Sequence, residues 1–178
     1  MQSDSGMTLV ELLTVVAITA TMAAFAMPRL TPLVLANRLD ALVAEAGDDI
    51  EFALSEAMRR GQPVTLCPVR GARGDCARAG NWQAGWIVFV DLNGNGVRDD
   101  GDTVVRRRSG FGTGVAVTAQ PRMAALTIDG EGVFVGLPRH ARMVFTLTAA
   151  GSASRRCIGL RNLTAEYAMQ RPGQGSCR

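Results

Sequence analysis

The sequence contains no lysine, because all nineteen of its basic residues are arginines. This absence excludes nucleotide-binding loops that need a lysine and enzymes that form a Schiff base through lysine. Histidine is scarce too: His140 is the only one, and no serine or cysteine with a matching acid is spaced to complete a catalytic triad with it. The sequence therefore predicts a protein that is not an enzyme.

Residues 1–28 contain no basic residue, and the first charged residue among them is an acid, Asp4. A secretory signal peptide has a basic leader, a shorter apolar core and a cleavage site after that core. Here the largely apolar run of residues 7–30 follows a leader of six residues. At about 1.5 Å per residue, this run is long enough to cross a hydrocarbon core of about 30 Å. We therefore expect residues 7–30 to form a transmembrane helix that the mature protein keeps.

One carboxylate, Glu11, lies inside this apolar run. An ionised carboxylate at the centre of a membrane helix is unfavourable by about 2.5 to 3.5 kcal/mol even on lenient insertion scales. Glu11 should therefore have a partner or a function. The alternative is a plain signal anchor in which Glu11 lies at the membrane interface.

The apolar residues after the predicted membrane span recur every three or four positions from Leu33 to Ala57, which indicates an amphipathic helix. Pro28 and Pro32 should loosen or kink the helix, and Gly61 with Pro63 should end it. Residues 31–61 are thus expected to continue the first helix and to dock on a globular domain.

Beyond Pro63 the apolar period changes to two, and short β-rich runs alternate with clusters of Gly, Pro, Asn and Asp. This pattern predicts an antiparallel domain built from hairpins. One long helix followed by strands gives an α+β fold in which the helix covers one sheet face. The expected strands are residues 64–67, 86–90, 103–105, 114–117, 126–128, 133–135, 143–147 and 156–158.

Four cysteines, an even number, lie in the predicted β domain. Disulfides persist outside the cytoplasm, where this domain is expected. Three pairings are possible, and we favour Cys67 with Cys76 and Cys157 with Cys177 because each closes a local loop, worth about 2 to 4 kcal/mol. Free buried thiols are the alternative, and a zinc site of all four cysteines lacks the usual close spacing.

The segment from Asp91 to Asp102 has the spacing of a calcium loop, with oxygen side chains at positions one, three, five, nine and twelve. Glycine stands at position six, and position seven offers a backbone carbonyl. The competing interpretation is a hairpin connection, since Asn-Gly favours tight turns and Asp and Asn bond their own backbone. The candidate Ca²⁺ ligands are Asp91, Asn93, Asn95, Val97, Asp99 and Asp102.

Two separate stretches resemble one known family. Gly6, Thr8, Leu9, Glu11, Leu12 and Leu13, followed by Ala26 and Pro28, resemble the class III signal of type IV pilins and type II secretion pseudopilins. Trp82, Gly85, Trp86, Phe89, Asp91, Asn93, Asn95, Gly96 and Asp102 resemble a motif of the GspH/FimT group of minor pilins and pseudopilins. The chain thus resembles a pilin-like protein of that group.

The resemblance implies that a prepilin peptidase cuts after Gly6 and N-methylates Met7. It also implies that Glu11 neutralises the amino terminus of a neighbouring subunit during assembly. The expected organisation is a leader of residues 1–6, a transmembrane half-helix of residues 7–30, an amphipathic half-helix of residues 31–61 and a periplasmic β-rich domain of residues 62–178.

The function implied is that of a minor pilin that primes or caps a type IV pilus, anchored in the inner membrane by a single span. Its expected partners are other minor and major pilins or pseudopilins, the prepilin peptidase, the inner-membrane assembly platform and membrane lipid. Two alternatives stay open: a GspH-like pseudopilin of a type II secretion system, and a DNA-binding minor pilin for natural transformation.

The DNA alternative rests on an uneven charge distribution. Residues 31–60 hold three arginines and six acids, whereas residues 61–178 hold fifteen arginines and eight acids. Clustered arginines bind phosphates, but we favour the competing interpretation, a solvated arginine-rich surface that follows from the biased composition. DNA-binding members of the family carry a Gly-Arg-x-Arg motif that residues 159–162 do not match. The candidate DNA contacts are Arg106, Arg107, Arg108, Arg155, Arg156 and Arg161.

Overall fold

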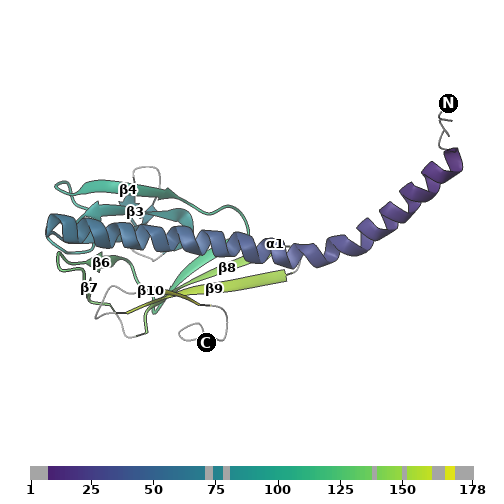
Figure 1. Ribbon diagram of the computed structural model, residues 1–178. Helices are drawn as coiled ribbons and strands as arrows, with labels where there is room; N and C mark the ends of the chain where they lie inside the picture. The colour runs from purple at the N-terminus through teal and green to yellow at the C-terminus, as the bar shows by residue number, and fades with distance from the viewer. Residues whose placement is uncertain are drawn as a thin grey trace, which may run out of the picture.

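The molecule is dominated by one helix, α1 (Leu9–Arg60), of 52 residues (Figure 1). Thr8 caps its start, because its Oγ1 accepts a hydrogen bond from the Glu11 N–H. Gly61 ends it with φ 62°, a left-handed conformation that glycine adopts without strain. The predicted helix end is therefore confirmed. This computed structural model describes residues 8–70, 74–77, 81–137, 140–149, 152–161 and 167–170.

The two ends of α1 have different surroundings. The first part, residues 9–24, extends away from the β domain, and all of its side chains are exposed; we call it the free half (Figure 1). The second part, residues 33–60, lies along the β domain; we call it the docked half. The helix curves between them but is continuous through Pro28 and Pro32.

Among the described residues, no helix combines the length and hydropathy that crossing a bilayer requires. The membrane span of residues 7–30 therefore stays a prediction. The predicted amphipathic face of the docked half is confirmed from Leu35 onward, whereas Leu33 is 58% exposed and lies outside it. Each residue at the centre of this face is at most 1% exposed: Leu39, Val43, Ala46, Ile50, Ala53 and Ala57.

The β domain contains two antiparallel sheets. The sequence pattern predicts an antiparallel domain built from hairpins, but it does not specify the number of sheets. The first has the strand order β4-β3-β1-β6-β7, with β2 paired to the end of β1. The second has the order β10-β9-β8-β5. The first sheet consists of β1 (Val64–Arg70), β2 (Asp75–Cys76), β3 (Gly85–Val90), β4 (Thr103–Ser109), β6 (Leu126–Ile128) and β7 (Phe134–Val135). The second consists of β5 (Val115–Gln120), β8 (Arg142–Ala149), β9 (Ser152–Leu160) and β10 (Tyr167–Gln170).

Most of the predicted strands are longer than expected, β4 and β9 by the largest amounts. Residues 103–105 were expected as a short strand, but β4 continues to Ser109 through the three arginines. Similarly, residues 156–158 extend to the nine residues of β9. Both extensions run through arginines, whose charge hides a strand when only apolar alternation is counted.

The core lies between the docked half of α1 and the two sheets. Trp82, in a short 3-10 helix η1 (Trp82–Ala84), packs edge-on against Trp86, with ring centroids 6.2 Å apart. Trp86 then contacts Phe111 at 5.5 Å, and Phe111 contacts Phe145 at 6.2 Å. This row of aromatic rings connects the first sheet, the β4–β5 loop and the second sheet.

The predicted Cys67–Cys76 disulfide is confirmed, with an S–S distance of 2.08 Å. It joins β1 to β2. Cys157 is buried and disulfide-bonded. Its predicted partner, Cys177, lies outside the described residues, so that pairing stays a prediction.

Candidate functional site

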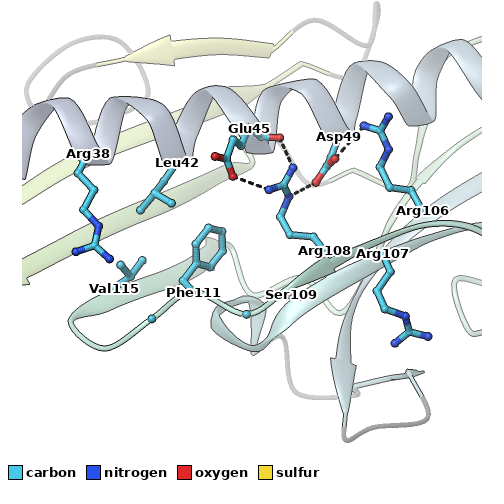
Figure 2. Close-up of a pocket in the computed structure, with 12 residues that line it drawn as sticks. Arg38, Leu42, Glu45, Asp49, Arg106, Arg107, Arg108, Ser109, Phe111 and Val115 are labelled. Atoms are coloured by element: carbon cyan, nitrogen blue, oxygen red, sulfur yellow. Dashed lines mark hydrogen bonds and ion pairs between the residues drawn. The ribbon is translucent and has the colours of Figure 1, made fainter.

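A groove of about 550 Å³ runs between the docked half of α1 and the far end of β4 (Figure 2). One wall is helical, and the other comes from β4 and the loop that leads to β5. The helical wall consists of Arg38, Leu42, Glu45 and Asp49, and the other wall of residues 106–112 with Val115.

Asp49 is the polar centre of this wall and is only 1% exposed. Its Oδ2 accepts a hydrogen bond from the Trp86 Nε1–H at 2.9 Å and another from Arg108 Nε. Its Oδ1 accepts a bond from Arg106 at 3.1 Å. A buried carboxylate needs such partners, because an unpaired buried charge is strongly unfavourable. Asp49 therefore holds β4 against the helix.

Arg108 reaches two acids on consecutive turns of α1. Besides Asp49, its guanidinium donates to Glu45 Oε2 at 2.6 Å and to the Glu45 carbonyl at 3.2 Å. The hydrogen bond with Asp49, opposed by burial, raises the pKa of Arg108 above its ordinary value. The guanidinium also lies 5.7 Å from the Trp86 ring centroid, within cation–π range.

The arginine run therefore splits by strand alternation. Arg106 faces the helix, where it also stacks over the Phe52 ring at 3.8 Å. Arg107 is exposed and points away from α1 in Figure 2. Because two of the three charges are paired within the chain, these residues do not form one free basic row.

The second predicted arginine cluster is divided in the same way. Arg156 donates to both oxygens of Asp40 on α1, at 2.5 and 3.3 Å. Arg155 and Arg161 are exposed. Part of the acidic charge of the docked half is thus complemented by the basic β domain, and DNA binding stays a prediction.

The Asp91–Asp102 loop is held by its own hydrogen bonds. Asp91 is fully buried and accepts bonds from the N–H groups of Asn95 and Gly96 and from the Thr65 hydroxyl, at 2.7 to 3.2 Å. Asp102 accepts bonds from the N–H groups of Leu92 and Asp99 at 3.1 and 2.8 Å. These bonds close the loop on itself.

The remaining oxygen side chains of the loop are joined to one another as well. Asp99 accepts from the side-chain amides of Asn93 and Asn95 at 2.9 and 2.8 Å, and these bonds lower the pKa of Asp99. In the described part of the chain, no three His, Cys, Asp or Glu residues are grouped as metal ligands. The hydrogen bonds within the loop support the alternative of a hydrogen-bonded turn. Calcium binding, including the role of Val97 as a carbonyl ligand, stays a prediction.

The calcium prediction has a direct test in the melting temperature of the protein. A fall on adding EDTA that calcium reverses and magnesium does not would support a calcium loop. An unchanged melting temperature would leave the hydrogen-bonded turn as the sufficient explanation.

Glu11 lies in the first turn of α1, within the exposed free half. Gly6 and Met7 lie outside the described residues, so cleavage and methylation there stay predictions. Sequence reasoning missed the pairing of Asp49 and Glu45 with β4. The sequence does carry a signal for Asp49. This acid lies three residues after Ala46 and directly before Ile50, so the helical spacing places it on the apolar face.

A long helix laid along antiparallel sheets is the architecture of a pilin-like protein. A family profile described as "Type II transport protein GspH" matches residues 44–164, more than half of the chain. The chain therefore belongs to the GspH family, a group of structural pilins and pseudopilins.

Two solved structures match this chain, and both are of the type IV minor pilin FimU from Pseudomonas aeruginosa strain PAO1. The crystal form in space group P21 is 17% identical, with 80% of this chain and 92% of that one covered and a TM-score of 0.51. The form in space group P65 is also 17% identical, with 79% and 95% covered and a TM-score of 0.49. A comparison with curated proteins found no match.

Proposed function

We propose that this chain is a minor pilin that primes or caps the assembly of a type IV pilus. The observation that carries the proposal is the free half of α1, which projects from a folded domain with its apolar side chains uncovered. The large ones are between 49% and 74% exposed: Leu9, Val10, Leu12, Leu13, Val15, Val16, Ile18 and Met22.

Uncovered apolar surface of this extent marks a membrane or protein contact. Apart from Glu11 and three threonines, the free half consists of apolar residues, which is expected of a helix surrounded by lipid or by other helices. We propose both environments in turn: the free half anchors the chain in the inner membrane with the β domain in the periplasm, and later packs among the helices of other pilins.

Processing and registration complete the proposal. The prepilin peptidase cuts after Gly6 and methylates Met7, and the assembly platform moves the mature chain into the filament. Glu11 then pairs with the amino terminus of a neighbouring subunit, an attraction that is much stronger in a low-dielectric surround than in water.

The test is to replace Glu11 by Gln, which keeps the shape and removes the charge. We expect the Glu11→Gln chain to accumulate in membranes and to be lost from sheared filaments. The matched control is Asp48→Asn, which removes an exposed acid from the docked half of the same helix. Equal amounts of wild-type and Glu11→Gln chains in filaments would contradict the role of Glu11.

A deletion strain separates the pilus from the alternative of a type II secretion pseudopilus. Loss of surface pili with normal protein secretion supports the minor pilin. Loss of secretion with intact pili would overturn our proposal in favour of the GspH-like pseudopilin.

The DNA-binding alternative rests on the exposed Arg107, Arg155 and Arg161. If the protein binds DNA through them, DNA migration is retarded at low salt and is restored when these residues become alanine. No retardation at low salt would exclude this function.

A further inference from the structure

The acids of the β domain gather at the end that is farthest from the free half. The structure describes seven acids beyond residue 60, and all except Asp75 lie in the β3–β4 loop or the β6–β7 turn: Asp91, Asp99, Asp100, Asp102, Asp129 and Glu131. The loop lies just past the end of α1, because the Asp91 N–H donates to the Pro63 carbonyl at 2.9 Å. The turn lies there too, since a Cβ on Gly130 would stand 2.5 Å from the Gly61 backbone.

The opposite end of the β domain is basic. It consists of the β4–β5 loop and of the end where β8 and β9 meet, which extends towards the free half in Figure 1. The Thr148 N–H donates to the Gly114 carbonyl at 2.8 Å, so the loop and the ends of these strands lie side by side. The sequence of residues 110–120 and 141–161 contains no acid and four arginines: Arg142, Arg155, Arg156 and Arg161.

Two guanidinium groups near this end lack an acidic partner among the described residues. Arg38 on α1 and Arg155 on β9 are exposed, and neither side chain has an ion pair or a hydrogen bond with a residue that the structure describes. They lie at a similar level along α1. Arg156, next to Arg155, pairs with Asp40, two residues after Arg38. This pair is neutral, so the charges of Arg38 and Arg155 remain uncompensated.

The position of Arg38 on the helix places this charge near the membrane. The predicted span ends at residue 30, and at about 1.5 Å per residue Arg38 lies about 12 Å beyond it along the helix. Lipid headgroups occupy about 5 to 8 Å of this distance, and charges act over a Debye length of about 10 Å. The exposed acid Asp48 lies about 27 Å beyond the span, which is outside this range. The uncompensated charges within range of the headgroups are therefore positive.

We propose that this end of the β domain rests on the inner membrane, where Arg38 and Arg155 bind the phosphates of anionic lipid headgroups. The proposal rests on the proposed function, because the anchored free half is what brings this end to the membrane surface. Every anchored copy makes the contact at the same height, and no second copy is needed. The acids at the far end are repelled by the same surface, so the charges orient the domain.

The contact is weak enough to be reversible. One arginine near an anionic surface strengthens association about fivefold. Two arginines therefore hold the domain on the membrane before assembly, and the contact breaks when the chain moves into a filament.

A photoreactive residue at position 153 tests the contact. Ala153 is exposed and lies two positions before Arg155, on the same face of β9. Full-length protein with benzoylphenylalanine in place of Ala153 is reconstituted in phosphatidylcholine vesicles with or without phosphatidylglycerol, illuminated, and weighed as intact protein. We expect a lipid adduct mainly with phosphatidylglycerol present. In the variant Arg38→Gln with Arg155→Gln, the adduct should fall at least about fivefold.

The matched control is Arg107→Gln with Arg161→Gln, which removes two exposed arginines from other parts of the β domain. Arg107 lies beside Arg108, which pairs with Asp49 farther along α1, and Arg161 follows the opposite end of β9. The control should give the same amount of adduct as the wild type. Equal amounts of adduct in both kinds of vesicle, or an equal fall in both double variants, would overturn the proposal.

Flotation of the same vesicles separates this proposal from the function it rests on. Protein that floats with the vesicles but gives no adduct with phosphatidylglycerol would refute the headgroup contact alone. Protein that does not float would refute the anchor and, with it, the proposed filament function.

Discussion

The free and docked halves belong to one continuous helix, yet they differ in almost every physical respect. In the free half all side chains are exposed and Glu11 is the only charge. In the docked half an apolar stripe is buried, and the acids Asp40, Glu45 and Asp49 pair with arginines of β4 and β9. One helix thus makes two kinds of contact. The apolar face of the docked half is buried within the chain, whereas the apolar side chains of the free half are left exposed for contact with other molecules.

The difference also bears on the arginine clusters. From the sequence, a basic domain beside an acidic helix half leaves two interpretations open, a solvated arginine-rich surface and a surface that binds DNA. In the structure, Arg106, Arg108 and Arg156 each have an acid of α1 as partner. A difference in net charge between two segments of one chain therefore indicates that they pack on each other as readily as it indicates that one of them binds a charged molecule.

The largest expected effect comes from breaking the docked half at Asp49. Asp49→Ala leaves two guanidinium groups and the Trp86 N–H without their buried acceptor, which should lower the free energy of unfolding by about 3 to 5 kcal/mol. Urea unfolding of the full chain in detergent, followed by tryptophan fluorescence, measures it. Asp48→Ala, at the exposed neighbouring acid, should change stability by less than about 0.5 kcal/mol. Similar losses in both variants would refute the anchoring role of Asp49.

A matched pair of leucines sharpens the comparison directly. Leu39→Ala empties a fully buried site in the docked half and should destabilise the fold by about 2 to 5 kcal/mol. Leu13→Ala removes the same atoms from the free half, where 58% of the residue is exposed, and should leave unfolding almost unchanged. Its effect should instead be seen as less chain in filaments. If the two variants lost the same stability, the division into halves would be wrong.

The smallest effect concerns the last turn of the docked half. Hydrogen bonds from Arg59 and Arg60 lower the pKa of Glu56 below its ordinary value, despite the opposing effect of burial. A carboxylate whose pKa is lowered in the folded state stabilises the folded state at pH values above its ordinary pKa. This contribution is lost as the pH falls through the folded-state pKa. We expect the stability of the wild type, but not that of Glu56→Gln, to contain this loss below about pH 4.3. Parallel stability–pH curves for the two would contradict it.

Local signals were sufficient for much of the fold. The helix end followed from Gly61, the buried face from a spacing of three and four, and the Cys67–Cys76 pairing from the short loop between these residues. Each depends on residues close in sequence.

Long-range contacts were not predictable in this way. The division into two sheets and the bonds from Asp49 to β4 join residues far apart in the chain, 57 positions for Arg106 and 59 for Arg108. They depend on how the docked half is rotated on the sheet, which no local pattern specifies. Arg38 is a further case, because its exposure beside Phe111 follows only from the path of the β4–β5 loop.

The most direct test of the account is the intact mass of the protein from membranes of cells with and without a prepilin peptidase. The filament role of the free half predicts the loss of residues 1–6 and the gain of one methyl group, only where the peptidase is present. A chain that keeps Met1 in both strains would contradict that role and leave an anchored β domain as the better explanation.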